Sequence, residues 1–152
     1  MMQKLTPYRL YILYASTAAT AGLVTLLGLW GTNAAIAVAC VLLYFTLGAA
    51  QGFLLSSTHP EELTPRYAPM FLMLLVGLAP VLLGVTLGIS PEVWEGWLLR
   101  LHHPATFLLA RDRIRDGDLG TIDYLFFFFL PAILVWLGVC IQAAVRKWGK
   151  AK

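Results

Sequence analysis

The sequence predicts an all-α integral membrane protein with four transmembrane helices in an antiparallel bundle, and its composition is the first reason. Hydrophobic residues make up 59% of the 152 residues and charged residues only 12%, while the mean hydropathy is +0.76. Soluble domains contain about 25% charged residues, so this composition could not cover a water-exposed surface. The second reason is length, because four apolar runs each reach the roughly 20 helical residues that cross a bilayer. We expect residues 1–152 to form a single transmembrane domain.

The first two spans are expected at residues 10–30 and 34–55. A cleavable signal peptide is the alternative for the first, but its apolar run exceeds the roughly 7–15 residues of a signal core. Only three residues join the two spans, so they must form a tight antiparallel hairpin. Asn33 suits the cap of the second helix, since its side chain can accept a hydrogen bond from a free amide of the first turn. Pro60 should end that helix, because a proline disfavours helical geometry at the preceding residue.

The last two spans are expected at residues 70–89 and 124–145. Pro69 suits the first turn of the third helix, where a missing amide hydrogen costs no hydrogen bond. Pro80 falls near the middle of that helix and predicts a kink. The fourth span contains Pro131 and is followed by a basic segment.

Orientation follows from the cations near the helix ends, because cytoplasmic loops carry an excess of Lys and Arg. All lysines lie near the two ends of the sequence, at Lys4, Lys147, Lys150 and Lys152. We therefore expect both termini in the cytoplasm and the bundle in the cytoplasmic membrane, although four arginines in the third connection oppose this orientation. The same distribution fits membrane topology better than a nucleic-acid partner, despite a net charge of +3.

The two cysteines are expected to stay free thiols. In this topology Cys40 lies in the outer half of the second helix and Cys140 in the inner half of the fourth. At about 1.5 Å of rise per residue their depths differ by more than roughly 10 Å, beyond the reach of a disulfide.

The third connection, residues 90–123, is long enough to carry one or two short interfacial helices on the outer leaflet. Ser90, Pro91 and Glu92 form a helix start, and apolar residues then recur at helical spacing. Two interpretations remain open: these helices shield the bundle, or they form a docking platform for a partner or a lipid headgroup. The candidate interfacial or headgroup contacts are Trp94, Trp97, Arg100, His102, His103, Arg111, Arg113 and Arg115.

Within the four predicted spans there is no charged residue. Ion-coupled transporters and intramembrane enzymes usually carry such groups, so their absence disfavours both classes. Adjacent histidines on a helix diverge by about 100°, so His102 and His103 cannot easily share a metal. The acidic stretch at 116–123 lacks the terminal acids of a calcium loop. We expect no catalytic residue, no metal and no cofactor.

Two glycine pairs with i,i+4 spacing are the candidate helix-packing or partner interfaces, because paired glycines let helices approach closely. The first pair, Gly48 and Gly52, encloses Gln51, whose amide can hydrogen-bond across an interface; the second pair is Gly84 and Gly88. Packing within the bundle and association with another chain are both left open. Gln51 also belongs to a possible polar stripe with Thr20 and Thr86.

These features lead to three functional hypotheses. The first is a non-catalytic subunit or accessory protein of a membrane complex, with membrane lipid and a protein partner or second copy as neighbours. The alternative is a small oligomeric transporter, flippase or channel, motivated by the polar stripe. The third is a lipid-active enzyme that uses His102, His103, Arg111 or Asp112 of the third connection. The motifs resemble no membrane family that we recognise.

Overall fold

The computed structural model describes residues 7–30, 33–56, 63–90, 93 and 120–150. Four long helices account for nearly all of these residues, and each contains a stretch long and apolar enough to cross a membrane. The predicted all-helical bundle of four apolar spans is therefore confirmed. The helices are α1 (Pro7–Trp30), α2 (Ala34–Ser56), α3 (Leu63–Thr86) and α5 (Thr121–Lys150).

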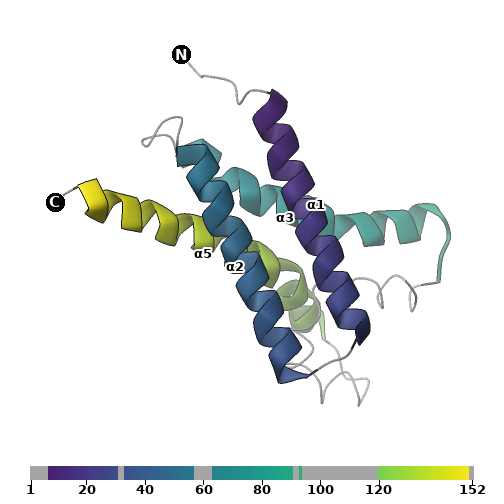
Figure 1. Cartoon of the computed structure of the whole chain (residues 1–152). Coiled ribbons are helices and arrows are strands. Elements are labelled where there is room, and N and C mark those ends of the chain that lie inside the picture. The colour runs from purple at the N-terminus through teal and green to yellow at the C-terminus, as the bar shows by residue number, and fades with distance from the viewer. Residues whose placement is uncertain (1–6, 31–32, 57–62, 91–92, 94–119, 151–152) are drawn as a thin grey trace.

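Helix α2 is the centre of the bundle. It packs most extensively against α5 and also contacts α1 and α3, while α3 contacts α5 and α1. In the described part of the chain, α1 and α5 do not contact each other. Figure 1 shows α1 and α2 as neighbours in front, with α3 and α5 crossing behind them. Neighbouring helices thus follow the order α1, α2, α5, α3 around the bundle, and α2 also contacts α3 across it.

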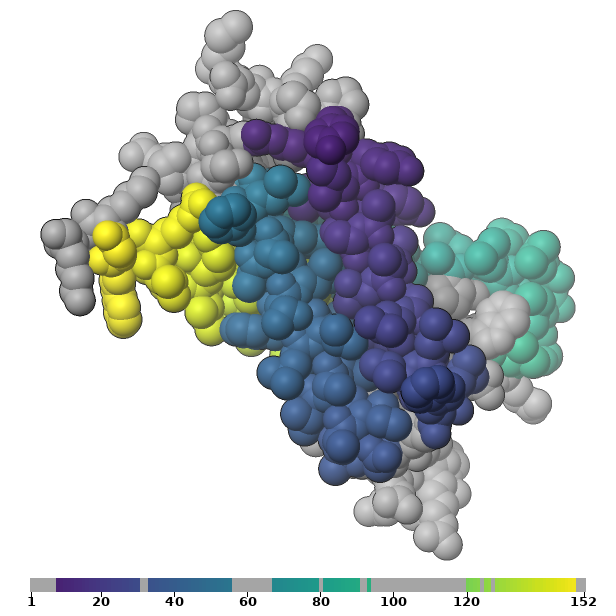
Figure 2. Space-filling view, viewed as in Figure 1, coloured from purple at the N-terminus to yellow at the C-terminus, as the bar shows by residue number. Residues whose placement is uncertain are grey.

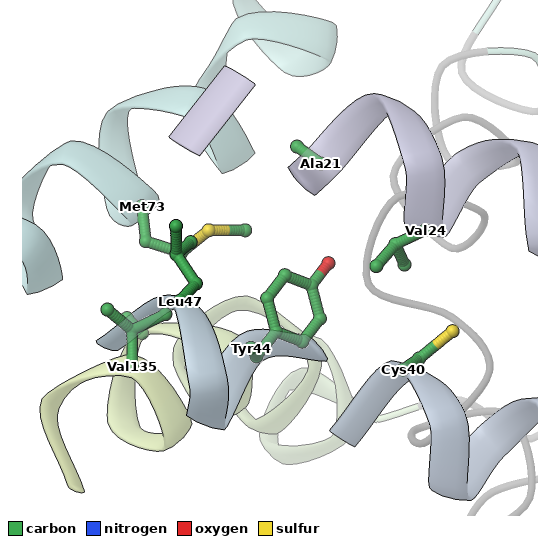
Figure 3. Packing of buried hydrophobic residues seen from close by; sticks show 8 residues of the cluster. Ala21, Val24, Cys40, Tyr44, Leu47, Met73 and Val135 are labelled. Atoms are coloured by element: carbon green, nitrogen blue, oxygen red, sulfur yellow. The ribbon is translucent and has the colours of Figure 1, made fainter. Parts of the chain in front are cut away.

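All four helices contribute side chains to the core. Its centre is Tyr44, whose ring lies among side chains from the other helices (Figure 3). Lipid is as apolar as these side chains, so close packing and dispersion, rather than exclusion of water, stabilise the contacts. The buried residues of the cluster are Ala21, Val24, Cys40, Tyr44, Leu47, Met73, Ala132 and Val135.

Helices α2 and α5 both begin with a side-chain cap. The Asn33 Oδ1 accepts a hydrogen bond from the Ile36 amide at 2.9 Å, which confirms the predicted cap of α2. At α5, the Gly120 amide donates to the Asp123 Oδ2 at 3.0 Å, and the Asp123 amide donates to the Gly120 carbonyl at 3.0 Å. This reciprocal cap starts α5 at Thr121, three residues before the predicted start, with an acid in the first turn where the helix dipole favours it.

Helix α3 begins seven residues before its predicted start. The prediction placed Pro69 in the first turn, but the helix starts at Leu63 and the first-turn proline is Pro65. Pro69 instead lies inside the helix, where its side chain is buried. The helix continues through position 80, and the predicted kink there remains a prediction.

Helix α3 ends at Thr86, three residues before its predicted end, because a glycine closes it. The Ile89 amide donates to the Gly84 carbonyl at 2.9 Å, and the Gly88 amide donates to the Val85 carbonyl at 3.3 Å. Gly88 has a φ of +63°. This is the Schellman arrangement, in which a left-handed residue, usually glycine, returns the last amides onto the helix.

The C-terminal part of α3 runs outward from the bundle, past α1. Figure 2 shows this segment protruding on one side of the molecule. Large apolar side chains cover it, and Val85 is 66% exposed. Lipid is the surrounding solvent that suits such side chains. The segment therefore belongs to the surface of the bundle, together with Leu82, Leu83 and Leu87.

Most of the third connection lies outside the described residues. The exceptions are residues 90, 93 and 120–123. The Val93 amide donates to the Ser90 carbonyl at 3.0 Å, so a turn begins where the sequence predicts a helix start. The one or two predicted interfacial helices remain predictions.

Candidate functional site

Gln51 is a deeply buried polar side chain of α2, with 3% of its surface exposed. Its Nε2 lies 3.1 Å from the Leu13 carbonyl oxygen, 2.8 Å from the Ser16 Oγ and 2.9 Å from the Thr17 Oγ1. All three acceptors belong to α1. We call these four residues the Gln51 cluster. It is a polar contact between the first two helices inside a largely apolar bundle.

The hydroxyl groups of the cluster have their own donor bonds. Ser16 and Thr17 both donate to the Leu13 carbonyl, at 3.0 and 2.8 Å. Their protons are therefore used, and their oxygen lone pairs are left to accept from the Gln51 amide. The Leu13 carbonyl can only accept, which decides that the nitrogen of Gln51 and not its oxygen points toward α1.

The other end of the same amide lacks a partner. The Gln51 Oε1 is buried and has no hydrogen-bond donor among the described residues. Gln142 on α5 has a buried Oε1 in the same condition. An unpaired buried acceptor has a free-energy cost, so most such atoms in proteins have partners. These two oxygens are buried hydrogen-bond acceptors for which the described residues supply no donor.

Two glycines let the backbones of α2 and α5 touch. A Cβ built on Gly48 would overlap the carbonyl oxygen of Val135 and lie 2.7 Å from its carbonyl carbon. A Cβ built on Gly138 would overlap the Phe45 carbonyl oxygen and lie 2.8 Å from the Ala49 nitrogen. No side-chain rotation relieves a clash with backbone, so these positions accept only glycine in this arrangement. We call this contact the glycine crossing.

The glycine crossing continues along α5 toward its C-terminal end. A Cβ on Gly52 would lie 3.1 Å from the Val139 Cα and 3.4 Å from the Gln142 Oε1. One turn beyond Gln142, the Arg146 Cζ lies 4.6 Å from the ring centroid of Phe53. Positions 138, 142 and 146 are four apart, so a single face of α5 follows α2 to its end.

Tyr67 of α3 and Trp136 of α5 form a second contact between helices. Their rings stack with centroids 6.4 Å apart and planes 10° apart. Offset-stacked aromatic pairs contribute about 0.5–1.5 kcal/mol beyond the area they bury. This pair therefore helps to hold α3 against α5.

The structure does not bring the predicted polar stripe together. Thr86, the last residue of α3, is exposed and its hydroxyl donates to the Leu82 carbonyl at 2.7 Å. Gln51 lies near the C-terminal end of α2, at the opposite end of an antiparallel bundle. Thr20 is half-buried on α1, one turn beyond Ser16 and Thr17. Sequence reasoning singled out Gln51 but did not assign Ser16 and Thr17 to it as partners.

The second glycine pair, Gly84 and Gly88, lies at the end of α3 and takes part in its closing turn. Gly84 is buried, whereas a Cβ on Gly88 meets nothing within 4 Å. Gly88 closes α3, and Gly84 supplies the carbonyl that accepts the closing bond. Sequence reasoning missed Gly138 because the residue four positions later is Gln142, so no glycine pair marked it.

The remaining sequence-predicted residues fall largely outside the described part. Cys40 is buried and Cys140 half-buried, and neither forms a disulfide, as predicted. Among the described residues, no three His, Cys, Asp or Glu side chains lie close enough to hold a metal.

The candidate contacts of the third connection all lie outside the described residues. They are Trp94, Trp97, Arg100, His102, His103, Arg111, Arg113 and Arg115.

Comparison with known proteins yields no relative. No family model matches the sequence, and no curated protein or solved structure is significantly similar to it. The geometry described above therefore carries the functional argument alone: the chain is a small membrane protein built on four helices.

Proposed function

We propose that this chain is a non-catalytic subunit or accessory protein of a membrane complex, and that it binds its partner through lipid-facing helix surfaces. The glycine crossing carries this proposal. Backbone contact between α2 and α5 closes the interface on one side of α2, and the Gln51 cluster fixes α1 to α2. A bundle joined in this way is suited to present rigid outer faces.

The outer faces offer extensive apolar surface for a second membrane protein. Helix association in lipid depends on close packing and on interhelical hydrogen bonds. Leu26 of α1 and Leu75 of α3 both point away from the core and are more than half exposed. These two faces are the surfaces on which we expect a partner, either another protein or a second copy of the chain.

Photo-crosslinking in native membranes tests this proposal. A crosslinking amino acid would replace Leu26 or Leu75 in the full chain, with the buried Val135 as the matched control. We expect a discrete heavier product from at least one lipid-facing position and none from Val135. A product of twice the chain mass identifies a second copy, and another mass identifies a protein partner. Only free chain from every lipid-facing position would contradict the proposal.

The proposal includes an orientation in which the N-terminal end of α1 and the C-terminal end of α5 face the cytoplasm. The cations Arg9, Arg146 and Lys147 support it, because all three lie at that end of the bundle. Cysteines introduced after α5 and in the third connection would be labelled with a membrane-impermeant maleimide in intact cells. We expect labelling only in the third connection.

A small transporter is the second candidate, and the two unpaired amide oxygens favour it. The Gln51 Oε1 and the Gln142 Oε1 could accept hydrogen bonds from a polar solute. Under this hypothesis, reconstituted protein moves polar solutes into liposomes and Gln51→Leu stops that movement. Flux equal to that of empty liposomes would exclude it.

A further inference from the structure

We propose that the C-terminal ends of α2 and α5 form a binding site for the phosphate of an anionic phospholipid, with Arg146 as its principal ligand. The site lies at the opposite end of the bundle from the third connection, where the sequence alone suggested headgroup contacts. The inference does not depend on the proposed function.

The first observation is the position of the Arg146 guanidinium. It is half-buried and lies over the Phe53 ring, with 4.6 Å between its Cζ and the ring centroid. A cation–π contact is an electrostatic attraction to the ring, so it leaves N–H donors of the guanidinium to bind an anion. The Phe53 ring thus holds the donor fork in place without satisfying it.

The second observation concerns charge. Among the described residues, no carboxylate pairs with Arg9, Arg146 or Lys147. A partly buried cation is costly unless an anion neutralises it. A phosphate is the anion whose geometry matches the guanidinium fork, because two of its oxygens accept two parallel N–H bonds.

The third observation places this fork at the depth of lipid headgroups. Helix α5 has 30 residues, which at 1.5 Å per residue span about 45 Å, well beyond the roughly 30 Å of hydrocarbon. Its last turns therefore extend into the headgroup region. Trp148, 78% exposed, is the type of residue that settles at this boundary. Figure 2 shows the end of α5 projecting beyond α2. A headgroup phosphate is thus an anion present at the depth of Arg146.

Native mass spectrometry of the full chain in mild detergent tests the site. Phosphatidylglycerol and phosphatidylcholine would be titrated separately onto wild type, Arg146→Gln, Arg146→Lys and the neighbouring control Lys147→Gln. We expect wild type to prefer phosphatidylglycerol and Arg146→Gln to weaken that binding about tenfold. Arg146→Lys keeps the charge but loses the fork, so it should weaken binding about threefold. Lys147→Gln, which removes an exposed charge, should weaken it less than about twofold.

A variant that leaves the charge untouched provides a second test. Phe53→Leu removes the ring that holds Arg146 but keeps an apolar side chain, so phosphatidylglycerol binding should weaken severalfold with an unchanged melting temperature. If Arg146→Gln and Lys147→Gln weakened phosphatidylglycerol binding equally, the lipid would be responding to general surface charge. That result would overturn the proposal. Competition by soluble glycerol phosphate at the same concentration as the lipid would also overturn it, because the site would then recognise a free anion.

Discussion

The side-chain amide of Gln51 has hydrogen-bond partners on its nitrogen but not on its oxygen. Its nitrogen has three acceptors on α1, while its oxygen has no donor among the described residues. The hydrogen bonds that Nε2 donates lower the free energy of the folded state, and the cost of burying Oε1 without a donor partly offsets this gain. The net stabilisation is best measured as the coupling between Gln51 and one of its partners.

A double-mutant cycle of Gln51→Leu with Thr17→Val measures this coupling. We expect a coupling energy of about 1 kcal/mol, typical of interhelical hydrogen bonds in membranes. The measurement is reversible unfolding in mixed micelles. Thr46→Val is the control for Thr17→Val, because the exposed Thr46 hydroxyl only donates to the Leu43 carbonyl of its own helix. Additive effects of the two substitutions would show that the cluster does not tie α1 to α2.

The glycine crossing predicts a strong contrast between glycines of similar sequence context. Gly48→Ala and Gly138→Ala would each drive a methyl group into backbone, which should reach or exceed the roughly 1–3 kcal/mol of an overpacked core. Gly22→Ala is the matched control, because nothing lies within 4 Å of its Cβ position. Alanine also favours helix, so this variant should be neutral or up to about 1 kcal/mol more stable. Equal melting temperatures for the three variants would contradict the crossing.

The four spans could be predicted at the scale of elements, and so could the helix ends that meet in the first hairpin, but both ends of α3 and the start of α5 could not. A span is fixed by the thickness of the membrane, which the run of apolar residues reveals directly. An end is fixed by a few local hydrogen bonds that compete with one another. For α3, either Pro65 or Pro69 could have opened the helix, and for α5 the Asp123 side chain turned an expected connection into a first turn.

The partners of each site residue depend on a further quantity, the register between helices. The sequence shows which side chains share a face of α2, but not which residues of α1 or α5 lie at the same height. This is why Gln51 could be singled out as a polar contact, whereas Ser16 and Thr17 could not be assigned to it. Gly138 illustrates the same limit, because its partners Phe45 and Ala49 carry no sequence signal.

The closing turn of α3 supplies a prediction at this scale. Gly88→Ala should destabilise the end of the helix by about 1–2 kcal/mol, because the left-handed conformation brings a Cβ close to the following carbonyl. Gly88→Asn should lose less, since asparagine adopts this conformation more readily. Both variants can be compared by helix content and thermal unfolding in detergent. A Gly88→Ala variant as stable as wild type would show that another turn closes the helix.

At the scale of the whole molecule, packing is concentrated around α2 and thins toward the end of α3. Local opening is easiest where few packed neighbours hold a segment. Hydrogen–deuterium exchange in micelles should therefore label residues 81–86 before the middle of α2 or α5. Protection of residues 81–86 equal to that of residues 44–52 would indicate that another part of the chain covers this end of α3.

The most extensive contact of the bundle joins two helices that lie far apart in the chain. Helix α2 ends at Ser56 and α5 begins at Thr121, so at about 5–20 residues per second a ribosome needs several seconds to produce the second after the first. During that interval the Gly48 face of α2 has no partner from α5. The Gln51 cluster, by contrast, is complete once the first hairpin has been inserted. The polar contact that looks modest in the finished bundle is thus available to hold α1 and α2 together before α5 has been made.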